Sequence, residues 1–85
     1  MEYNEVWVVP VLHAEEFFRQ NSAVQRGEQD NRSKYLYKNC LITIEKLPGK
    51  GILNIPQTRV VMSGQDNDTG EIHEKFFLNF LSAGG

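Results

Sequence analysis

The chain has 85 residues, of which 40% are hydrophobic, and a formal net charge of −2 at pH 7. Residues 1–85 are expected to form a single domain, because two separate cores would each be too small to be stable without disulfides or metals. The small negative charge argues against a strongly basic nucleic-acid-binding domain, and the single cysteine, Cys40, excludes an internal disulfide and a cysteine-rich metal site.

An apolar run at residues 6–12 predicts the first β-strand. Its residues are hydrophobic on both faces and mostly β-branched, which favours a strand that is covered on both sides. Pro10 removes one backbone donor, so we expect an edge strand or a tail beyond the paired part. The run is too short to span a membrane and no basic segment precedes it, so we expect an unsecreted, cytoplasmic protein with no membrane partner.

The residues that follow have a helical period, with glutamates on the opposite side that we expect to be solvated. We expect a helix that ends near Gln20 or at Gly27. The apolar stripe consists of Ala14, Phe17, Phe18 and Val24.

Three segments lack hydrophobic residues to bury. Residues 27–34 and residues 64–70 are polar and rich in turn-forming residues, which predicts two flexible loops. Residues 82–85 predict a frayed C-terminus.

Residues 35–62 predict a β-hairpin. In its first strand the even-numbered positions are the better core face, which leaves Tyr35 and Tyr37 on the opposite, mixed face. Residues 47–51 have turn chemistry, because proline presets φ and glycine supplies positive φ. Pro56 interrupts the returning strand and predicts a bulge or an edge position.

The last apolar segment, residues 71–81, has both a helical and a strand interpretation. Asp68 with Glu71 has the spacing of a capping box, and one stripe has helical spacing, so we favour a helix. The stripe consists of Ile72, Phe76, Phe77, Phe80 and Leu81. The predicted fold class is α+β, with a small antiparallel sheet of three to four strands and one or two helices on one face. The element order is β-α-β-β-α; the alternative order is β-α-β-β-β, a small mainly-β domain.

No group of residues has the spacing of a catalytic, cofactor or metal site. His13 and Glu15 match half of the zinc deaminase signature, but its Cys-x-x-Cys half is absent. Cys40 shares the strand parity of aliphatic residues, where a thiol acts as a small hydrophobe. Lys50 precedes Gly51 rather than the Ser or Thr of a phosphate loop. We therefore expect no enzyme activity, no metal and no cofactor.

The hairpin is the predicted interaction surface. Two tyrosines on one strand face with bases nearby are typical of sheets that hold single-stranded nucleic acid, by stacking and phosphate contacts. The overall charge predicts that such binding is weak and salt-sensitive. The candidate surface consists of Trp7, Tyr35, Tyr37, Lys38, Lys46, Lys50 and Arg59.

The chain has more large apolar residues than one thin layer needs, since residues 6–12 and 76–81 are hydrophobic on nearly all sides. Exposed apolar patches usually meet a partner, and a two-fold dimer is the commonest closed assembly. We therefore expect a non-enzymatic interaction or regulatory protein that acts as a homodimer and binds another macromolecule. The alternatives are weak single-stranded nucleic-acid binding and binding of a small apolar ligand in a pocket lined by Trp7, Phe17 and Tyr37.

Overall fold

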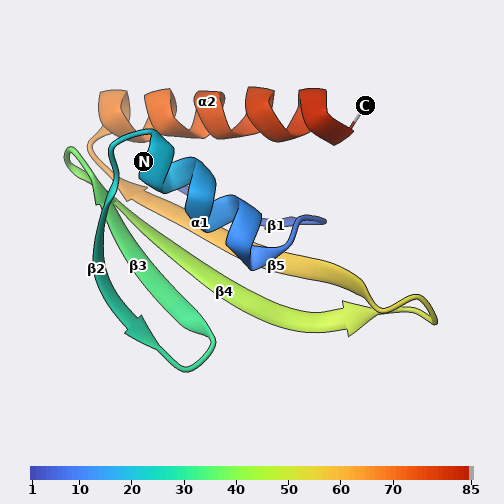
Figure 1. Ribbon diagram of the computed structural model, residues 1–85. Helices are drawn as coiled ribbons and strands as arrows, with labels where there is room; N and C mark the ends of the chain where they lie inside the picture. Colours follow the sequence, from blue (N-terminus) through green and yellow to red (C-terminus); the bar gives the residue numbers. More distant parts are fainter. Residues whose placement is uncertain (85) are drawn as a thin grey trace.

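The computed structural model describes the backbone of residues 1–84 and the side chains of residues 1–81. Five strands form one antiparallel sheet in the order β1-β5-β4-β3-β2. Two helices lie together on one face of this sheet (Figure 1). In chain order the elements are β1 (Glu2–Trp7), α1 (Val11–Gln20), β2 (Val24–Gln29), β3 (Arg32–Tyr37), β4 (Cys40–Lys50), β5 (Ile55–Gly64) and α2 (Asp66–Gly84).

The predicted α+β class is confirmed, with five strands instead of the expected three to four. Residues 71–81 lie within α2, so the helical interpretation is right and the mainly-β alternative is wrong. The expected capping box does not form. Instead, the Gln65 side chain caps the helix, because its Oε1 accepts a hydrogen bond from the Asp68 backbone N–H at 2.8 Å.

The first strand lies earlier in the chain than predicted. β1 ends at Trp7, and Pro10 is the residue before the first turn of α1, with φ −65° and ψ 146°. The Pro10 carbonyl accepts hydrogen bonds from the backbone N–H groups of His13 and Ala14 at 3.1 and 3.2 Å. Proline suits a helix start because the missing N–H would have no partner there. The edge position is correct, since β1 is an outer strand of the sheet.

Residues 27–34, predicted to be a loop, instead contribute to a hairpin of β2 and β3. Asp30, at the turn between the two strands, has φ 50°, a conformation that aspartate tolerates well. Every residue of β2 is exposed. The strand therefore has no hydrophobic pattern by which its sequence could reveal it.

The second predicted loop, residues 64–70, is also mostly regular structure. β5 continues to Gly64 and α2 begins at Asp66, so the connection is very short. Residues 82–85 were predicted to be a frayed end. The backbone of α2 extends to Gly84, and Gly85 lies outside the described residues.

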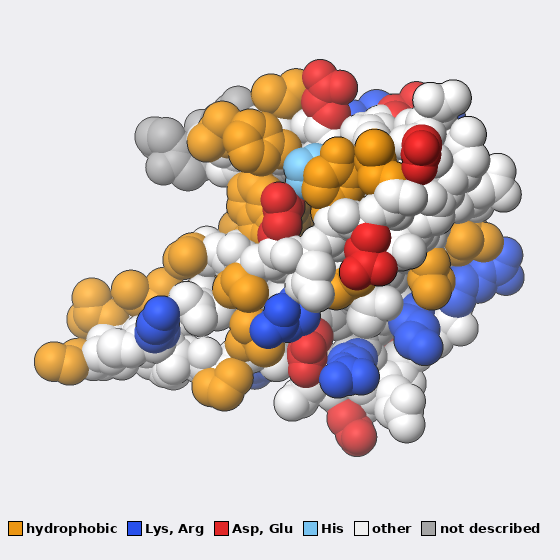
Figure 2. Space-filling view, turned by 180° about the vertical axis from the view of Figure 1, so that it is seen from behind, with side chains coloured by type: hydrophobic (Ala, Val, Ile, Leu, Met, Phe, Trp, Pro, Cys, Tyr) orange, Lys and Arg blue, Asp and Glu red, His pale blue; other side chains and the backbone are white. Residues whose placement is uncertain are grey.

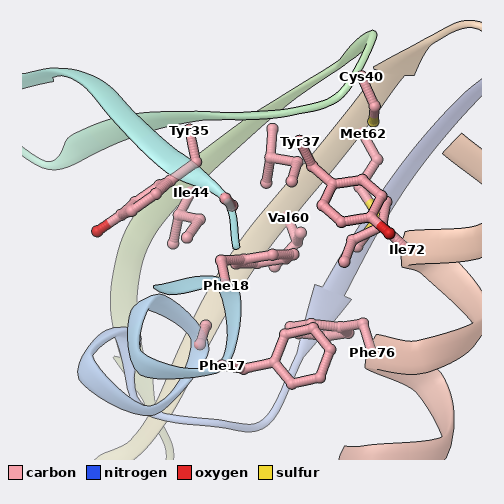
Figure 3. Close-up of a cluster of buried hydrophobic side chains, with 13 residues drawn as sticks. Phe17, Phe18, Tyr35, Tyr37, Cys40, Ile44, Val60, Met62, Ile72 and Phe76 are labelled. Atoms are coloured by element: carbon pink, nitrogen blue, oxygen red, sulfur yellow. The ribbon is translucent and has the colours of Figure 1, made fainter. Parts of the chain in front are cut away.

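The hydrophobic core lies between the helices and one face of the sheet (Figure 3). Phe76 of α2 is at its centre, with ring centroids 5.3 and 5.2 Å from those of Phe17 and Phe18 on α1. The sheet contributes alternate residues of β3, β4 and β5, as expected when one face of a strand is buried. They include Tyr35, Tyr37, Cys40, Ile42, Ile44, Val60 and Met62.

Candidate interaction surface

β4 and β5 continue past the strands that flank them. β3 pairs with β4 only as far as Glu45, and β1 pairs with β5 only from Thr58 onward. Residues 46–57 therefore form a two-stranded ribbon that projects from the molecule (Figure 1), which we call the arm. A hairpin without a third strand or a covering helix is only marginally stable in water.

The ladder of the arm is interrupted. Pro48 and Pro56 have no N–H to donate, and the pairing of β4 with β5 shifts register between Leu47 and Lys50. An irregularity was expected near Pro56, and the arm contains it. The paired positions are Lys46 with Thr58, Leu47 with Gln57 and Lys50 with Ile55. The stability of so interrupted a ribbon depends strongly on what covers it.

The turn of the arm lies at residues 51–54, not at residues 47–51 as predicted. Gly51 and Asn54 have φ values of 76° and 52°, a conformation favoured by glycine and asparagine. The Asn54 N–H donates a hydrogen bond to the Gly51 carbonyl at 3.1 Å. Pro48 and Gly49, which were predicted to belong to the turn, instead lie at the register shift within the strands.

The tip of the arm carries two large apolar side chains in full contact with solvent. Ile52 is 103% exposed and Leu53 is 84% exposed. Lys46 and Lys50 are the only charged residues between positions 46 and 57. The arm is therefore an apolar and basic projection, and hydrophobic side chains line it in Figure 2.

Apolar side chains of both helices are exposed on the side from which the arm projects. In Figure 1 the first turn of α1 and the C-terminal end of α2 lie toward the side from which the arm projects. A monomer rarely exposes several large apolar groups close together unless they meet a partner. The exposed side chains are Leu12, Phe77, Leu78 and Leu81.

Two hollows lie beside α1. One, of about 510 Å³, separates the start of α1 from the base of the arm, with Val11 and Leu12 in its wall. The other, of about 310 Å³, lies between α1 and α2 and is lined in part by His13, Glu16 and Phe80. Phe17 lines the second hollow, but Trp7 and Tyr37 line neither, and binding of a small apolar ligand stays a prediction.

The residues predicted as the interaction surface do not form one surface. Lys46 and Lys50 belong to the arm. Arg59 is on the sheet face opposite the helices, where its Nε lies 3.6 Å from Glu45 Oε1. Trp7 is half-buried against the rings of Phe76 and Phe77, with its indole N–H donating to Glu5.

The exposed position predicted for the two tyrosines is wrong. Tyr35 is 0% exposed and Tyr37 is 4% exposed, and both rings lie in the core (Figure 3). Base stacking needs an accessible ring face. The two tyrosines therefore do not provide the stacking surface on which the nucleic-acid alternative depended.

An unrecognised turn caused this error. Lys38 and Asn39 form a two-residue connection between β3 and β4, with Lys38 at φ 52°. Tyr37 therefore pairs with Cys40 and both side chains point to the same face. One continuous strand would instead have put them on opposite faces.

Tyr37 and Lys38 converge on one carboxylate at the start of α2. The Tyr37 hydroxyl donates a hydrogen bond to Glu71, and Lys38 Nζ lies 2.9 Å from Glu71 Oε1. The hydrogen bond from Tyr37 has the largest effect on this carboxylate and that from Lys38 the second largest. Both hold the pKa of Glu71 below its ordinary value. The same carboxylate raises the pKa of Lys38.

This carboxylate predicts a pH-dependent contribution to stability. A lowered pKa in the folded state gives stability that is present above the ordinary pKa of 4.5 and is lost as pH falls through the folded value. The Glu71→Gln variant is therefore expected to be less stable than wild type at pH 6, by a difference that shrinks toward pH 3. Urea denaturation at both pH values measures it, and an unchanged difference contradicts the prediction.

Glu15 is a buried acid that sequence reasoning placed in solvent. Its Oε2 accepts hydrogen bonds from Ser33 Oγ at 2.8 Å and from the Tyr35 hydroxyl at 3.3 Å, which tie α1 to β3. The pKa of Tyr35 is raised, mainly because the hydroxyl is removed from water and secondly because the negative charge of Glu15 lies beside it. The spacing of Val11, Ala14, Glu15 and Phe18 as one helix face could have revealed this burial.

Histidine and cysteine side chains lie apart from one another. Cys40 is fully buried. His73 stacks on Tyr3 with centroids 3.6 Å apart, and its Nε2 lies 2.8 Å from Glu5 Oε1, which fixes α2 to β1. Among the described residues, no three His, Cys, Asp or Glu side chains lie close enough together to hold a metal ion.

No family model matches this chain, and neither a curated protein sequence nor a solved structure matches it. Across the described part of the chain, no helix combines the length and the apolar character that crossing a membrane requires.

Proposed function

We propose that this protein is a non-enzymatic interaction protein that acts as a homodimer and binds another macromolecule. The observation that carries the proposal is the arm, an apolar tip on a ribbon that its own chain leaves uncovered. Burying large side chains such as those of Ile52 and Leu53 is worth about 1.5–3 kcal/mol each. A surface that covers the tip is therefore favoured over solvent.

The ionisable side chains support a role in binding rather than in catalysis. General acid–base chemistry needs a titratable group placed where a substrate can reach it. Glu15 has its hydrogen bonds with two buried hydroxyls, and His73 has a stacking partner and a carboxylate. Among the described residues that line the hollow at the base of the arm, Lys46 alone has an ionisable side chain.

The exposed apolar residues support a dimer. A stable interface typically buries about 800 Å² on each partner, and this chain has 5527 Å² of accessible surface in total. About a seventh of the surface would meet the requirement, which the arm and the neighbouring ends of α1 and α2 could supply together. The cytoplasmic location is proposed on the basis of the sequence alone.

Light scattering after size-exclusion chromatography tests the dimer. We expect a mass twice that of the 9.8 kDa chain at micromolar concentration. We also expect the unfolding midpoint to rise with protein concentration, because association stabilises only the folded state. A species of one chain mass over the whole micromolar range would contradict the proposed homodimer.

A further inference from the structure

We propose that two copies of this chain exchange arms, so that the arm of each copy lies along the exposed side of α1 in the other. The proposal rests on the homodimer of the proposed function and specifies its contact surface. The arm, residues 46–57, is the inserted element. The two hollows beside α1 are the seat.

The arm needs a covering surface that its own copy does not provide. The pairing of β4 with β3 ends at Glu45, the pairing of β5 with β1 begins at Thr58, and the side chains at the tip are exposed. Its prolines and the register shift weaken the ladder that would hold it alone. Docking on a second molecule both buries the tip and stabilises the ribbon.

The seat has the shape and the polarity that the arm requires. Both hollows lie beside the first turn of α1, since Leu12 lines one and His13 lines the other. The larger, about 510 Å³, is within the range of sites that hold ligand-sized apolar groups. Ile52 and Leu53 enter this hollow, and the bases of the arm follow along α1 toward Glu16.

Charge complementarity favours a second copy as the occupant. The arm has two bases and no acid, whereas the rest of the chain has seven bases and eleven acids, a net charge of −4. Glu16 lines the smaller hollow of the seat, whereas Lys46 lines the larger one, so the carboxylate that the bases of an inserted arm would meet is at the smaller hollow. Opposite charges across an interface steer association and fix its register. One chain therefore carries both halves of a complementary pair.

The reciprocal contact closes into a dimer of ordinary size. When the same two patches meet twice about a two-fold axis, no binding surface is left open. The arm has twelve residues, and ten further residues line the two hollows outside it. Together they fall within the ~20–30 residues per partner of a standard interface.

A double substitution at the tip tests the exchange. The variant Ile52→Ser with Leu53→Ser is expected to weaken dimerisation at least about 100-fold, since it removes two apolar anchors from each copy. Light scattering on a dilution series measures the dissociation constant, and circular dichroism checks the fold. The matched control, Val24→Ser with Leu41→Ser, changes two exposed side chains on the opposite sheet face and should leave the dimer intact.

Charge reversal tests the position of the seat. Lys50→Glu and Glu16→Lys are each expected to weaken the dimer about tenfold, and the combined variant to recover most of the loss. Reversals without effect would overturn the seat on α1. A tip variant that dimerises like wild type would overturn arm exchange while leaving the homodimer in place, whereas a monomeric wild type would overturn both.

Discussion

Replacing Phe76 with alanine is expected to lower the free energy of unfolding by about 3–5 kcal/mol, enough to leave a domain of this size largely unfolded or close to it. Phe76 is fully buried, and its ring centroid lies 5.1, 5.2 and 4.6 Å from those of Trp7, Phe18 and Phe80. The substitution leaves a cavity where α1, α2 and the sheet meet. Urea denaturation followed by circular dichroism measures the loss.

The adjacent ring is the matched control. Phe77 is 40% exposed and its centroid lies 5.8 Å from that of Trp7, so Phe77→Ala is expected to cost only about 1 kcal/mol. Equal losses for the two variants would contradict the central position of Phe76. They would indicate that the exposed side of α2 contributes as much to the core as its buried side.

The core of the two helices was largely predictable from the sequence. Of the stripe predicted for α1, Phe17 and Phe18 are buried, whereas Val24 is exposed in β2. Of the stripe predicted for α2, Ile72 and Phe76 are buried, whereas Phe77 and Leu81 are exposed. Helical periodicity works here because one continuous face of each helix meets the sheet. The same pattern would have identified Glu15, had a polar residue been allowed on that face.

The strands were predicted less well, for two physical reasons. A two-residue turn at Lys38 and Asn39 reverses the alternation of side chains, and without recognising it the tyrosines are assigned to solvent. β2 is an edge strand whose six residues are all exposed, so hydrophobicity does not distinguish it from a loop. The first error assigns two core tyrosines of β3 to an exposed surface. The second leaves one strand out of the predicted sheet.

The predicted interaction surface and the arm share two residues. Lys46 and Lys50 were expected on a hairpin that binds a partner, and both lie on the arm. Ile52 and Leu53 were assigned to a returning strand, although glycines at positions 49 and 51 and prolines at 48 and 56 bracket them. Such a cluster around two large aliphatic residues is a signal for an exposed tip, because neither strand can bury them.

Replacing Gly64 with alanine is expected to cost about 3 kcal/mol or more, through the backbone rather than through a lost contact. Gly64 has φ 154°, and a Cβ there would lie 2.1 Å from the Asn39 carbonyl oxygen and 2.9 Å from Cys40 Cα. Both neighbours are backbone atoms of the β3–β4 turn and cannot rotate away. The added Cβ therefore pushes this turn away from the end of β5. It also disturbs the hydrogen bond that the Gly64 N–H donates to the Met1 carbonyl at 3.1 Å.

Gly27→Ala is the control, because a Cβ at that position in β2 would meet nothing within 4 Å. Removing a glycine at an unstrained site restricts the unfolded chain, so this variant is expected to match wild type or to exceed it by up to about 1 kcal/mol. Thermal unfolding of the two variants at one protein concentration compares them directly. If Gly64→Ala unfolded at the wild-type temperature, the close approach of β5 to the β3–β4 turn would have to be wrong.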